Sequence, residues 1–288
     1  MFKTILVHLK GTSGDKSSLA AAYALTRPFT PHLEALHIRP DIETLMARAS
    51  MSGSEGDTIA LADMVDAMQE QAARLAQQAS DTYDSFCRDE QIVRAEFPPG
   101  PGGPNAAFRE SLGVEVEELM GQGRYYDLVV VKGGGESSGG LSTGDLGRLV
   151  TTTGKPILLA PDAPAKPAQT IVVAWKDTPE AARAVTAAMP LLEKAQTVYL
   201  VGAEEDGRAS NYEGVEAQLK WHGLNAQVQR VNPGDREPAH ATLEAARALG
   251  ADLLVMGGYG RSRLSETILG GFTRAVLQDA SLPVFLFH

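Results

Sequence analysis

The residues with the clearest capacity for chemistry are the glycines that follow the apolar run ADLLVM. This segment reads GGYGRSRLSETILGGFTRAVL, and it spaces its glycines as Gly257, two residues, Gly260, nine residues, Gly270 and Gly271. Glycine lacks a Cβ and reaches positive φ, so backbone N–H groups can come close to a phosphate. The spacing therefore predicts a phosphate-binding loop, and a tight turn with a close helix–sheet contact is the structural alternative.

A short helix from Phe272 to Asp279 is expected directly after this loop. A helix N-terminus presents free N–H groups and a partial positive charge, and both favour a phosphate. Gly270 and Gly271 would lie at this N-terminus. Thr273 would add a hydroxyl group and Arg261 a positive charge.

A second glycine-rich segment, KGGGESSGGLSTGDLGRLV from Lys132, follows the apolar run YDLVVV. Gly133 and Gly144 fit the same pattern, but Glu136 stands where the second glycine would be, and the spacing differs. A carboxylate in a phosphate loop repels the phosphate. The segment is a diverged binding loop or only a flexible Gly/Ser loop.

Other chemistry finds little support in the sequence. There is no G-x-x-x-x-G-K-[ST] loop and no G-x-S-x-G turn. The six histidines lack metal-type spacing, and Cys87 has no partner cysteine. His8 and His37 are the one histidine pair that could meet near a ligand edge, at the ends of neighbouring strands. No catalytic residue is assigned, and no metal site is predicted.

The loops need strands to position them, and the chain carries those strands twice. Three landmarks recur in the same order: KTILVHLKG from Lys3 with QTIVVAWKD from Gln169, YDLVVVKGGG from Tyr126 with ADLLVMGGYG from Ala251, and KPILLAP from Lys155 with LPVFLFH from Leu282. Such recurrence is typical of an internal duplication.

Short apolar runs alternate with helical patterns in each copy. Strands are expected near 3–9, 33–38, 92–97, 127–132 and 156–160, and near 170–175, 197–201, 226–231, 252–256 and 283–287. Continuous apolar runs suit strands that are buried on both faces of a parallel sheet. Their alternation with helices indicates βαβ units. The predicted fold is α/β, with two tandem doubly wound domains, each a five-stranded parallel sheet flanked by helices.

The domains are expected at 1–162 and 168–288, on either side of the Pro- and Ala-rich linker PDAPAKPAQ. An insertion near 42–57 makes the first domain longer. A helix is expected from about 58 to 88, with one face formed by Leu61, Met64, Met68, Ala72 and Leu75. Core or cover packing is expected for the methionines, and a ligand lid is the alternative.

Size and composition restrict the class of protein. The 288 residues accommodate two domains of about 140 residues. A net charge of −10 argues against a general nucleic-acid binder. A single cysteine favours a reducing compartment. Neither a secretory leader nor a membrane span of ~18–20 apolar residues is evident, so we expect a soluble cytoplasmic protein.

The pattern Gly-x2-Gly-x9-Gly, after a fourth strand and before a final helix and strand, resembles the universal stress protein family. The stretch from Gly257 to Leu277 carries the most specific similarity. The openings TILVHLKG and TIVVAWKD also resemble the first strand of that family. The resemblance covers nearly the whole chain, as a tandem member with two such domains, and leaves out only the insertion.

The resemblance implies ATP or another adenine nucleotide as the ligand, held mainly by the C-terminal copy. In the family, the loop after the first strand and the end of the second strand hold adenine and ribose, and the glycine loop holds the phosphates. Carried onto this chain, the binding residues would be Trp175, Lys176, Asp177, Gly257, Gly260, Arg261, Gly270, Gly271, Phe272 and Thr273.

The chain departs from the ATP-binding members at two places. Those members have Ser or Thr directly after the last motif glycine, where this chain has Gly271, and its nearest hydroxyl is on Thr273. They also tend to carry Asp at the end of the first strand, where this chain has Lys10 and Lys176. Asp177 is one residue later and could substitute. A lysine donates hydrogen bonds only, so it suits a phosphate rather than ribose hydroxyls.

The expected function is non-enzymatic binding or sensing of an adenine nucleotide in a stress response. One alternative is a protein-interaction module that has lost nucleotide binding, which the departures at Lys176, Gly271 and Glu136 favour. Another is a weak ATPase, which would need a water-activating residue that the sequence does not identify. The expected self-contact is an intramolecular pseudo-dimer through the last strands, near 156–160 and 283–287. Besides the nucleotide, a homodimer of whole chains and an unidentified protein are further candidate partners, whereas nucleic acid and membranes are not expected.

Overall fold

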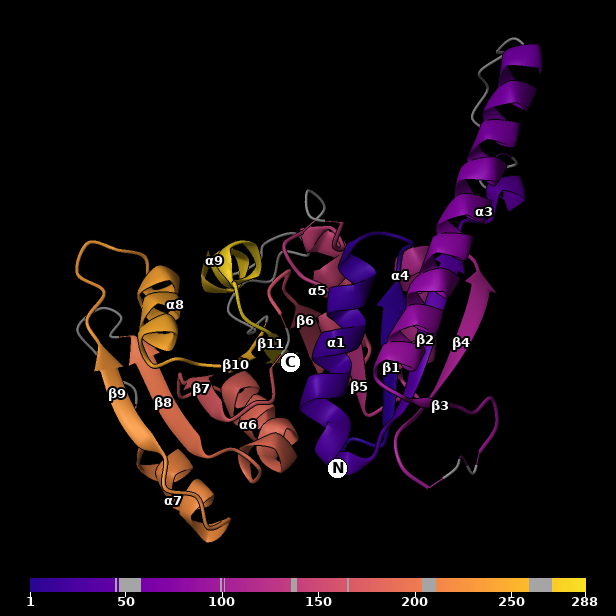
Figure 1. Ribbon diagram of the computed structural model, residues 1–288. Coiled ribbons are helices and arrows are strands. Elements are labelled where there is room, and N and C mark those ends of the chain that lie inside the picture. Colours follow the sequence, from indigo (N-terminus) through magenta and orange to yellow (C-terminus); the bar gives the residue numbers. More distant parts are fainter. Residues whose placement is uncertain are drawn as a thin grey trace.

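The computed structural model describes nine stretches of the chain: residues 1–44, 46, 58–98, 100, 102–135, 139–164, 166–203, 211–258 and 271–288. Within them, eleven strands form one sheet with the order β3-β4-β2-β1-β5-β6-β11-β10-β7-β8-β9 (Figure 1). Helices α1, α3, α6 and α7 pack on one face, and helices α4, α5, α8 and α9 pack on the other. The α/β, doubly wound fold class is therefore confirmed.

The N-terminal half supplies the first six strands and the helices that connect them. Its elements are β1 (Thr4–Leu9), α1 (Gly14–Thr26), the 3-10 turn η1 (Arg27–Phe29), β2 (His32–Arg39), α3 (Thr58–Asp89), β3 (Val93–Arg94), β4 (Asn105–Leu112), α4 (Glu115–Gly123), β5 (Leu128–Lys132), α5 (Thr143–Thr152) and β6 (Ile157–Ala160). All of its strand pairs are parallel.

The C-terminal half supplies the other five strands, which are also parallel to one another. Its elements are β7 (Thr170–Ala174), α6 (Pro179–Leu192), β8 (Thr197–Ala203), α7 (Glu213–Trp221), β9 (Gln227–Val231), α8 (Pro238–Ala248), β10 (Leu253–Gly257), α9 (Gly271–Asp279) and β11 (Val284–Phe287). The five strands predicted for this half all form, within two residues of the expected bounds.

The strand registers repeat between the halves. Val7 of β1 pairs with Val130 of β5, and the residues that align with them, Val173 and Val255, pair in the same way. Each of these strands is apolar and lies between helices on both faces, so the hydrophobic effect fixes the same register twice. The register thus supports the duplication that the three sequence landmarks indicate.

In each half, an aspartate directly before a strand, β5 or β10, connects that strand to the first strand of the half. The carboxylate of Asp127 accepts hydrogen bonds from the backbone N–H groups of Lys3 and Thr4, at 2.7 and 3.0 Å. Asp252 holds the start of β7 in the same way, with distances of 3.2 and 2.9 Å. A carboxylate that accepts hydrogen bonds from two backbone N–H groups of the neighbouring strand helps to fix the register of the two strands.

The two halves join through their last strands, as the sequence predicts. Strands β6 and β11 pair antiparallel, with Leu158 opposite Phe285 at the centre. The flanking pairs, Leu159 with Val284 and Ile157 with Leu286, exchange under the alignment of the two halves. The join therefore has a local two-fold symmetry, like the isologous interface of a homodimer.

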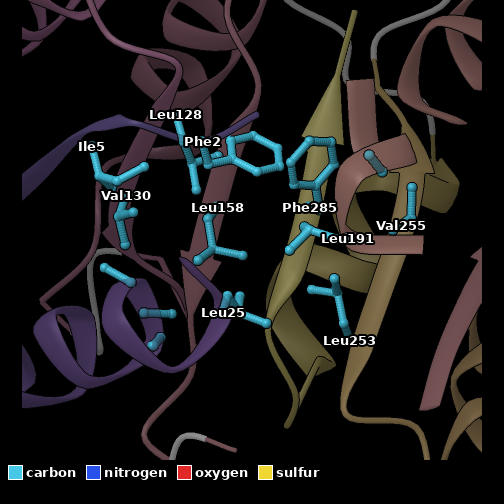
Figure 2. Packing of buried hydrophobic residues seen from close by; sticks show 14 of the residues in the cluster. Phe2, Ile5, Leu25, Leu128, Val130, Leu158, Leu191, Leu253, Val255 and Phe285 are labelled. Carbon is cyan, nitrogen blue, oxygen red and sulfur yellow. The ribbon is translucent and has the colours of Figure 1, made fainter. Parts of the chain in front are cut away.

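Aromatic side chains pack at the join between β6 and β11. Phe285 is fully buried, and its ring lies 6.1 Å from that of Phe2 in an edge-to-face arrangement. Figure 2 shows both rings beside Leu158, in a cluster that runs through residues of both halves. Because the pairing edges are apolar and buried, they close the sheet edge that each half would otherwise expose.

The third strand of the N-terminal half differs from the prediction. The stretch 92–97 contributes only the two-residue β3, and the longer β4 lies outside all of the predicted ranges. Strand β4 is close to the sheet edge, since only the short β3 lies outside it, and it can therefore carry the polar residues Arg109, Glu110 and Ser111. A pattern of continuous apolar runs therefore does not predict it, and the described part of this half has six strands rather than five.

The predicted long helix forms as α3 and extends beyond the rest of the molecule (Figure 1). Its inner part packs on the sheet, with Ala72 buried, whereas Met64 is 49% exposed. Core or cover packing therefore describes the inner part of the predicted face only. The insertion near 42–57 lies outside the described residues, apart from 42–44 and 46. No helix in the described part of the chain is long and apolar enough to span a membrane.

The join predicts a large effect of truncating its central aromatic ring. Phe285→Ala should lower the free energy of unfolding by ~3–5 kcal/mol, because the cavity would lie between two packed halves. Urea unfolding followed by circular dichroism measures this loss. Phe97→Ala is the matched control, since Phe97 is 80% exposed; its effect should stay within ~0.5 kcal/mol. Similar losses for the two variants would contradict this account of the join.

Candidate functional site

The C-terminal half has its strand-order reversal between β7 and β10, which are parallel neighbours. Ligands of open α/β sheets bind beyond the carboxyl ends of the strands at such a point. The predicted residues Trp175, Lys176 and Asp177 follow β7 directly, and Gly257 ends β10. The fold therefore brings these four predicted site residues to one edge of the sheet.

The turn after β7 is held at both ends. Trp175 is buried, its backbone N–H donates to the carbonyl oxygen of Val201 at 2.7 Å, and its indole N–H donates to that of Asn211 at 2.8 Å. Thr178 caps α6 by accepting from the N–H of Ala181 at 3.4 Å. Between these anchors, Lys176 and Asp177 are exposed. An exposed carboxylate on a fixed turn is suited to accept hydrogen bonds from ligand hydroxyls.

Helix α9 begins at Gly271, followed by Phe272, which is half-buried, and Thr273, which is buried. A Cβ built on Gly271 would meet no heavy atom within 4 Å, so the start of this helix has open space. The predicted residues Gly260, Arg261 and Gly270 lie outside the described residues.

Gly257 has a structural reason to be glycine. A Cβ at this position would lie 2.5 Å from the backbone nitrogen of Ala181 and 2.9 Å from the Cβ of Glu180. The first turn of α6 therefore packs directly on the end of β10. The structural alternative of a close helix–sheet contact is sufficient for this glycine, whereas Gly271 has no such contact.

At the corresponding edge of the N-terminal half, the contact between strand end and helix start is also made by one glycine and one large residue, but the glycine is in the helix. In the sequence alignment of the two halves, Lys132 corresponds to Gly257 and Gly14 to Glu180. A Cβ on Gly14 would lie 2.8 Å from Cδ of Lys132, so the lysine stem covers the start of α1. The Lys132 ammonium group lies 3.0 Å from a carboxylate oxygen of Asp162. The lysine stem thus occupies the place that the start of α6 occupies at the end of β10.

The N-terminus of α5 is capped by one of its own neighbours, Ser142. The Ser142 hydroxyl accepts from the backbone N–H of Asp145 at 3.0 Å and donates to its carboxylate at 2.8 Å. The carboxylate also supplies the negative charge that a helix N-terminus favours. At the end of β1, a Cβ on Gly11 would lie 2.2 Å from the carbonyl oxygen of Leu75, so helix α3 lies on this loop. Glu136, the predicted obstacle in this loop, lies outside the described residues.

A buried ionisable group lies at the same N-terminal edge. His8 is buried, and its Nε2 lies 3.3 Å from the Glu115 carboxylate, which also pairs with the Lys10 ammonium group at 3.0 Å. Burial, together with the smaller effect of the positive charges of Lys10 and His37, lowers the pKa of His8 to about 3. His37 is also buried, and its Nδ1 lies 2.9 Å from the carbonyl oxygen of Leu9. The part of the chain that the structure describes contains no group of three or more ligating side chains suited to a metal.

The sequence did not indicate one aromatic residue at the carboxyl ends of the strands in the C-terminal half. Tyr212 is buried, and a Cβ on Gly202 would lie 2.1 Å from its hydroxyl oxygen. The guanidinium group of Arg230 lies 5.7 Å from the centre of the tyrosine ring. A signal was available, because a glycine inside a strand often marks a close approach of another group. The sequence did not identify which residue approaches.

Comparison with known proteins shows which family the C-terminal half resembles. Residues 167–288 match the universal stress protein family. The family match thus covers the half that carries the open helix start, and the resemblance noted from the glycine spacing is confirmed for that half. No curated protein matches the chain.

Two solved structures share the fold over 99% of this chain. A universal stress protein from Archaeoglobus fulgidus DSM 4304 is 14% identical, is covered over 97% of its length and has a TM-score of 0.61. A putative universal stress protein from Pseudomonas aeruginosa UCBPP-PA14 is 14% identical, is covered over 93% of its length and has a TM-score of 0.56. At this level of identity the similarity shows the universal stress protein fold across both halves.

Two glycine variants should separate packing from open space in the C-terminal half. Gly257→Ala should lower the free energy of unfolding by ~1–3 kcal/mol, because its methyl group would overlap the start of α6. Gly271→Ala should change it by no more than ~0.5 kcal/mol, because its methyl group meets nothing. Chemical denaturation of both variants is the measurement. A larger loss for Gly271→Ala than for Gly257→Ala would refute the packing described for β10.

The buried His8 predicts a pH dependence of stability. Its pKa is about 3 when folded and 6.5 in the reference state, so below pH 6.5 the unfolded chain takes up a proton that the folded chain excludes. Stability from this group is complete above pH 6.5 and falls with pH, by about 3 kcal/mol at pH 4. Urea unfolding at pH 7 and pH 4 should therefore show a smaller decrease for His8→Gln. His222→Gln, at a more exposed site, should keep the wild-type decrease; an unchanged decrease in His8→Gln would show that the explanation is wrong.

Proposed function

We propose that the protein binds ATP or another adenine nucleotide in its C-terminal half and senses it in a stress response. The proposal divides the chain into domains at 1–162 and 168–288, with the first as a diverged partner of the second. One observation carries it: Asp177 after β7 and the open start of α9 lie on the two sides of the strand-order reversal.

The two sides of this edge suit the two polar parts of a nucleotide. The exposed carboxylate of Asp177 is an acceptor for ribose hydroxyls. The N-terminus of α9 offers backbone N–H groups and a partial positive charge to phosphates. The space at Gly271 lets a phosphate approach that backbone. In this proposal Gly260, Arg261, Gly270 and Thr273 complete the phosphate site, as the family resemblance implies.

The N-terminal half gives the contrast that restricts the proposal to one site. Its edge holds the stem of Lys132, the capped start of α5 and the backbone of α3 against Gly11. The cap of α5 and the backbone of α3 occupy charge or space that a nucleotide would need, whereas the Lys132 stem takes the place that the start of α6 takes at Gly257. One nucleotide per chain is therefore the proposed stoichiometry.

A protein-interaction module without a nucleotide is the second candidate. The buried Trp175 and Tyr212 favour it, because they fill part of the C-terminal edge with the chain's own side chains. A weak ATPase is the third candidate, and steady ADP production would favour it. The proposal also includes a cytoplasmic location, which the single free thiol, the buried Cys87, supports.

Calorimetric titration of the full chain with ATP tests the proposal. Wild type should bind one ATP per chain, and Gly271→Asp should weaken binding at least tenfold, because a carboxylate at the helix start repels phosphates (about 1.4 kcal/mol or more). Gly144→Asp is the matched control, since Gly144 is the aligned residue of α5 and its Cβ position meets only the Ser142 hydroxyl, at 3.9 Å. Its affinity for ATP should equal that of wild type.

The second candidate predicts a different result in the same experiment. No heat of binding with ATP, together with no nucleotide released from the denatured protein in mass spectrometry, would leave the interaction module as the better account. Equal weakening by Gly271→Asp and Gly144→Asp would place the site elsewhere than the start of α9.

A further inference from the structure

Tyr212 lies across the end of a strand to which it does not belong. It precedes α7, yet its hydroxyl oxygen reaches to 2.1 Å from the Cβ position of Gly202, near the end of β8. The carbonyl oxygen of Trp175 lies 2.9 Å from the same position. A side chain on residue 202 and the tyrosine ring therefore exclude one another. The glycine at the end of β8 makes room for a ring brought in from another element.

Three contacts hold this ring and its neighbour in place. The carbonyl oxygen of Asn211 accepts the indole N–H of Trp175 at 2.8 Å. The side-chain oxygen of Asn211 accepts from the backbone N–H of Glu213 at 3.0 Å, which fixes the start of α7. Arg230 of β9 lies over the tyrosine ring. Tyr212 is thus linked, through its neighbour Asn211, to the turn after β7 and to the first turn of α7.

This position lies in the direction that a nucleotide would take. The C-terminal sheet has the order β10-β7-β8, so a ligand with phosphates at α9 and ribose at Asp177 continues towards β8. Neighbouring strands are about 4.8 Å apart, which puts β8 roughly 10 Å from β10. The base of an extended nucleotide would reach the end of β8, where Tyr212 lies.

The N-terminal half closes the same place in another way. The register equivalent of Gly202 is His37, whose own side chain covers the carbonyl oxygen of Leu9 at 2.9 Å. Leu9 is in turn the equivalent of Trp175. The covering ring is therefore part of the strand in one half and comes from a separate helix start in the other. A ring on a separate element can leave without any change in the sheet.

We propose that Tyr212 is a displaceable plug of the C-terminal site, and that a purine nucleotide binds by displacing Tyr212 and the start of α7. This inference rests on the proposed function, because it assigns the regulation of that same site. The plug makes apparent affinity depend on how often the ring is away: a site open about one-tenth of the time binds tenfold more weakly than an open site. Displacement also breaks the Trp175–Asn211 hydrogen bond, so that ligand binding reaches α7.

The test uses full-length variants and ATP as the probe. Tyr212→Ala should bind ATP at least tenfold more tightly than wild type, and Tyr212→Phe, which keeps the ring, should stay within threefold of wild type. Arg230→Ala should tighten binding about threefold, because it removes only the cation–π contact on the ring. Arg230 is exposed, so this variant keeps the test informative if Tyr212→Ala does not fold.

A fluorescence measurement follows the displacement itself. The chain has two tryptophans, and Trp221 is 91% exposed, so Trp221→Phe leaves Trp175 as the sole reporter with little structural change. ATP should change the emission of Trp175 in this background. The change should be much smaller when Tyr212→Ala is added, because the neighbouring ring is already absent.

The outcomes separate the plug from the proposed function. Equal ATP affinity in wild type, Tyr212→Ala and Arg230→Ala would overturn the plug and leave nucleotide binding intact. Weaker binding by Tyr212→Ala would show that the ring contacts the nucleotide, which also overturns the plug. Absence of ATP binding in wild type and in all variants would overturn both inferences.

Discussion

The antiparallel pairing of β6 with β11 is the constraint on which the rest of the structure depends. It joins a six-stranded sheet and a five-stranded sheet into one, and it buries the apolar edge that each half would otherwise present. Because Leu158 lies opposite Phe285 in a symmetric register, the halves meet as the subunits of an isologous dimer do. Covalent linkage removes the concentration dependence of such a dimer, and it lets the two halves diverge without losing each other.

The same pairing puts each half beside the other's carboxyl edge at the join. Helix α5 leads into β6 and therefore ends near the amino end of that strand, which is where the antiparallel β11 ends. Accordingly, a Cβ on Gly258 would lie 3.6 Å from Val150 of α5. The N-terminal half thus contacts Gly258 directly after β10, even though its own edge is filled. A filled edge in the N-terminal half is compatible with the retention of that half, because its helix α5 remains part of the other half's surroundings.

Much of this fold could be predicted from the sequence, for a physical reason that also explains the exceptions. Strands buried on both faces must be continuously apolar, and β7, β8, β10 and β11 of the C-terminal half were found for this reason. The edge strand β9, which is not buried, was found as well. Strand β4 escaped because only the short β3 lies beyond it, so that its outer end carries polar residues such as Arg109. The pairing of the last strands followed from the same reasoning, because an apolar strand at a sheet edge needs a partner.

The candidate site could be predicted only in part, because local patterns identify positions and long-range packing decides what fills them. The sequence brought Trp175, Asp177 and Gly271 into one proposed site, and the strand order places all three at the same edge. It did not distinguish Gly257, which the start of α6 requires, from Gly271, which no contact requires. It could not identify Tyr212, whose approach to Gly202 depends on the path of the chain between β8 and α7.

The comparison between the halves shows how one scaffold can close the same edge in two ways. His37 and Lys132 are strand residues, so their side chains close the N-terminal edge for as long as the sheet is folded. In the C-terminal half the equivalent positions are Gly202 and Gly257, and the groups that cover them come from α6 and from the residue before α7. A single ring outside the sheet, such as that of Tyr212, can move at the cost of a few contacts, whereas a strand residue moves only with its strand. Removal of side chains from the strands is therefore what makes the C-terminal edge adjustable, and ligand-dependent movement needs that property.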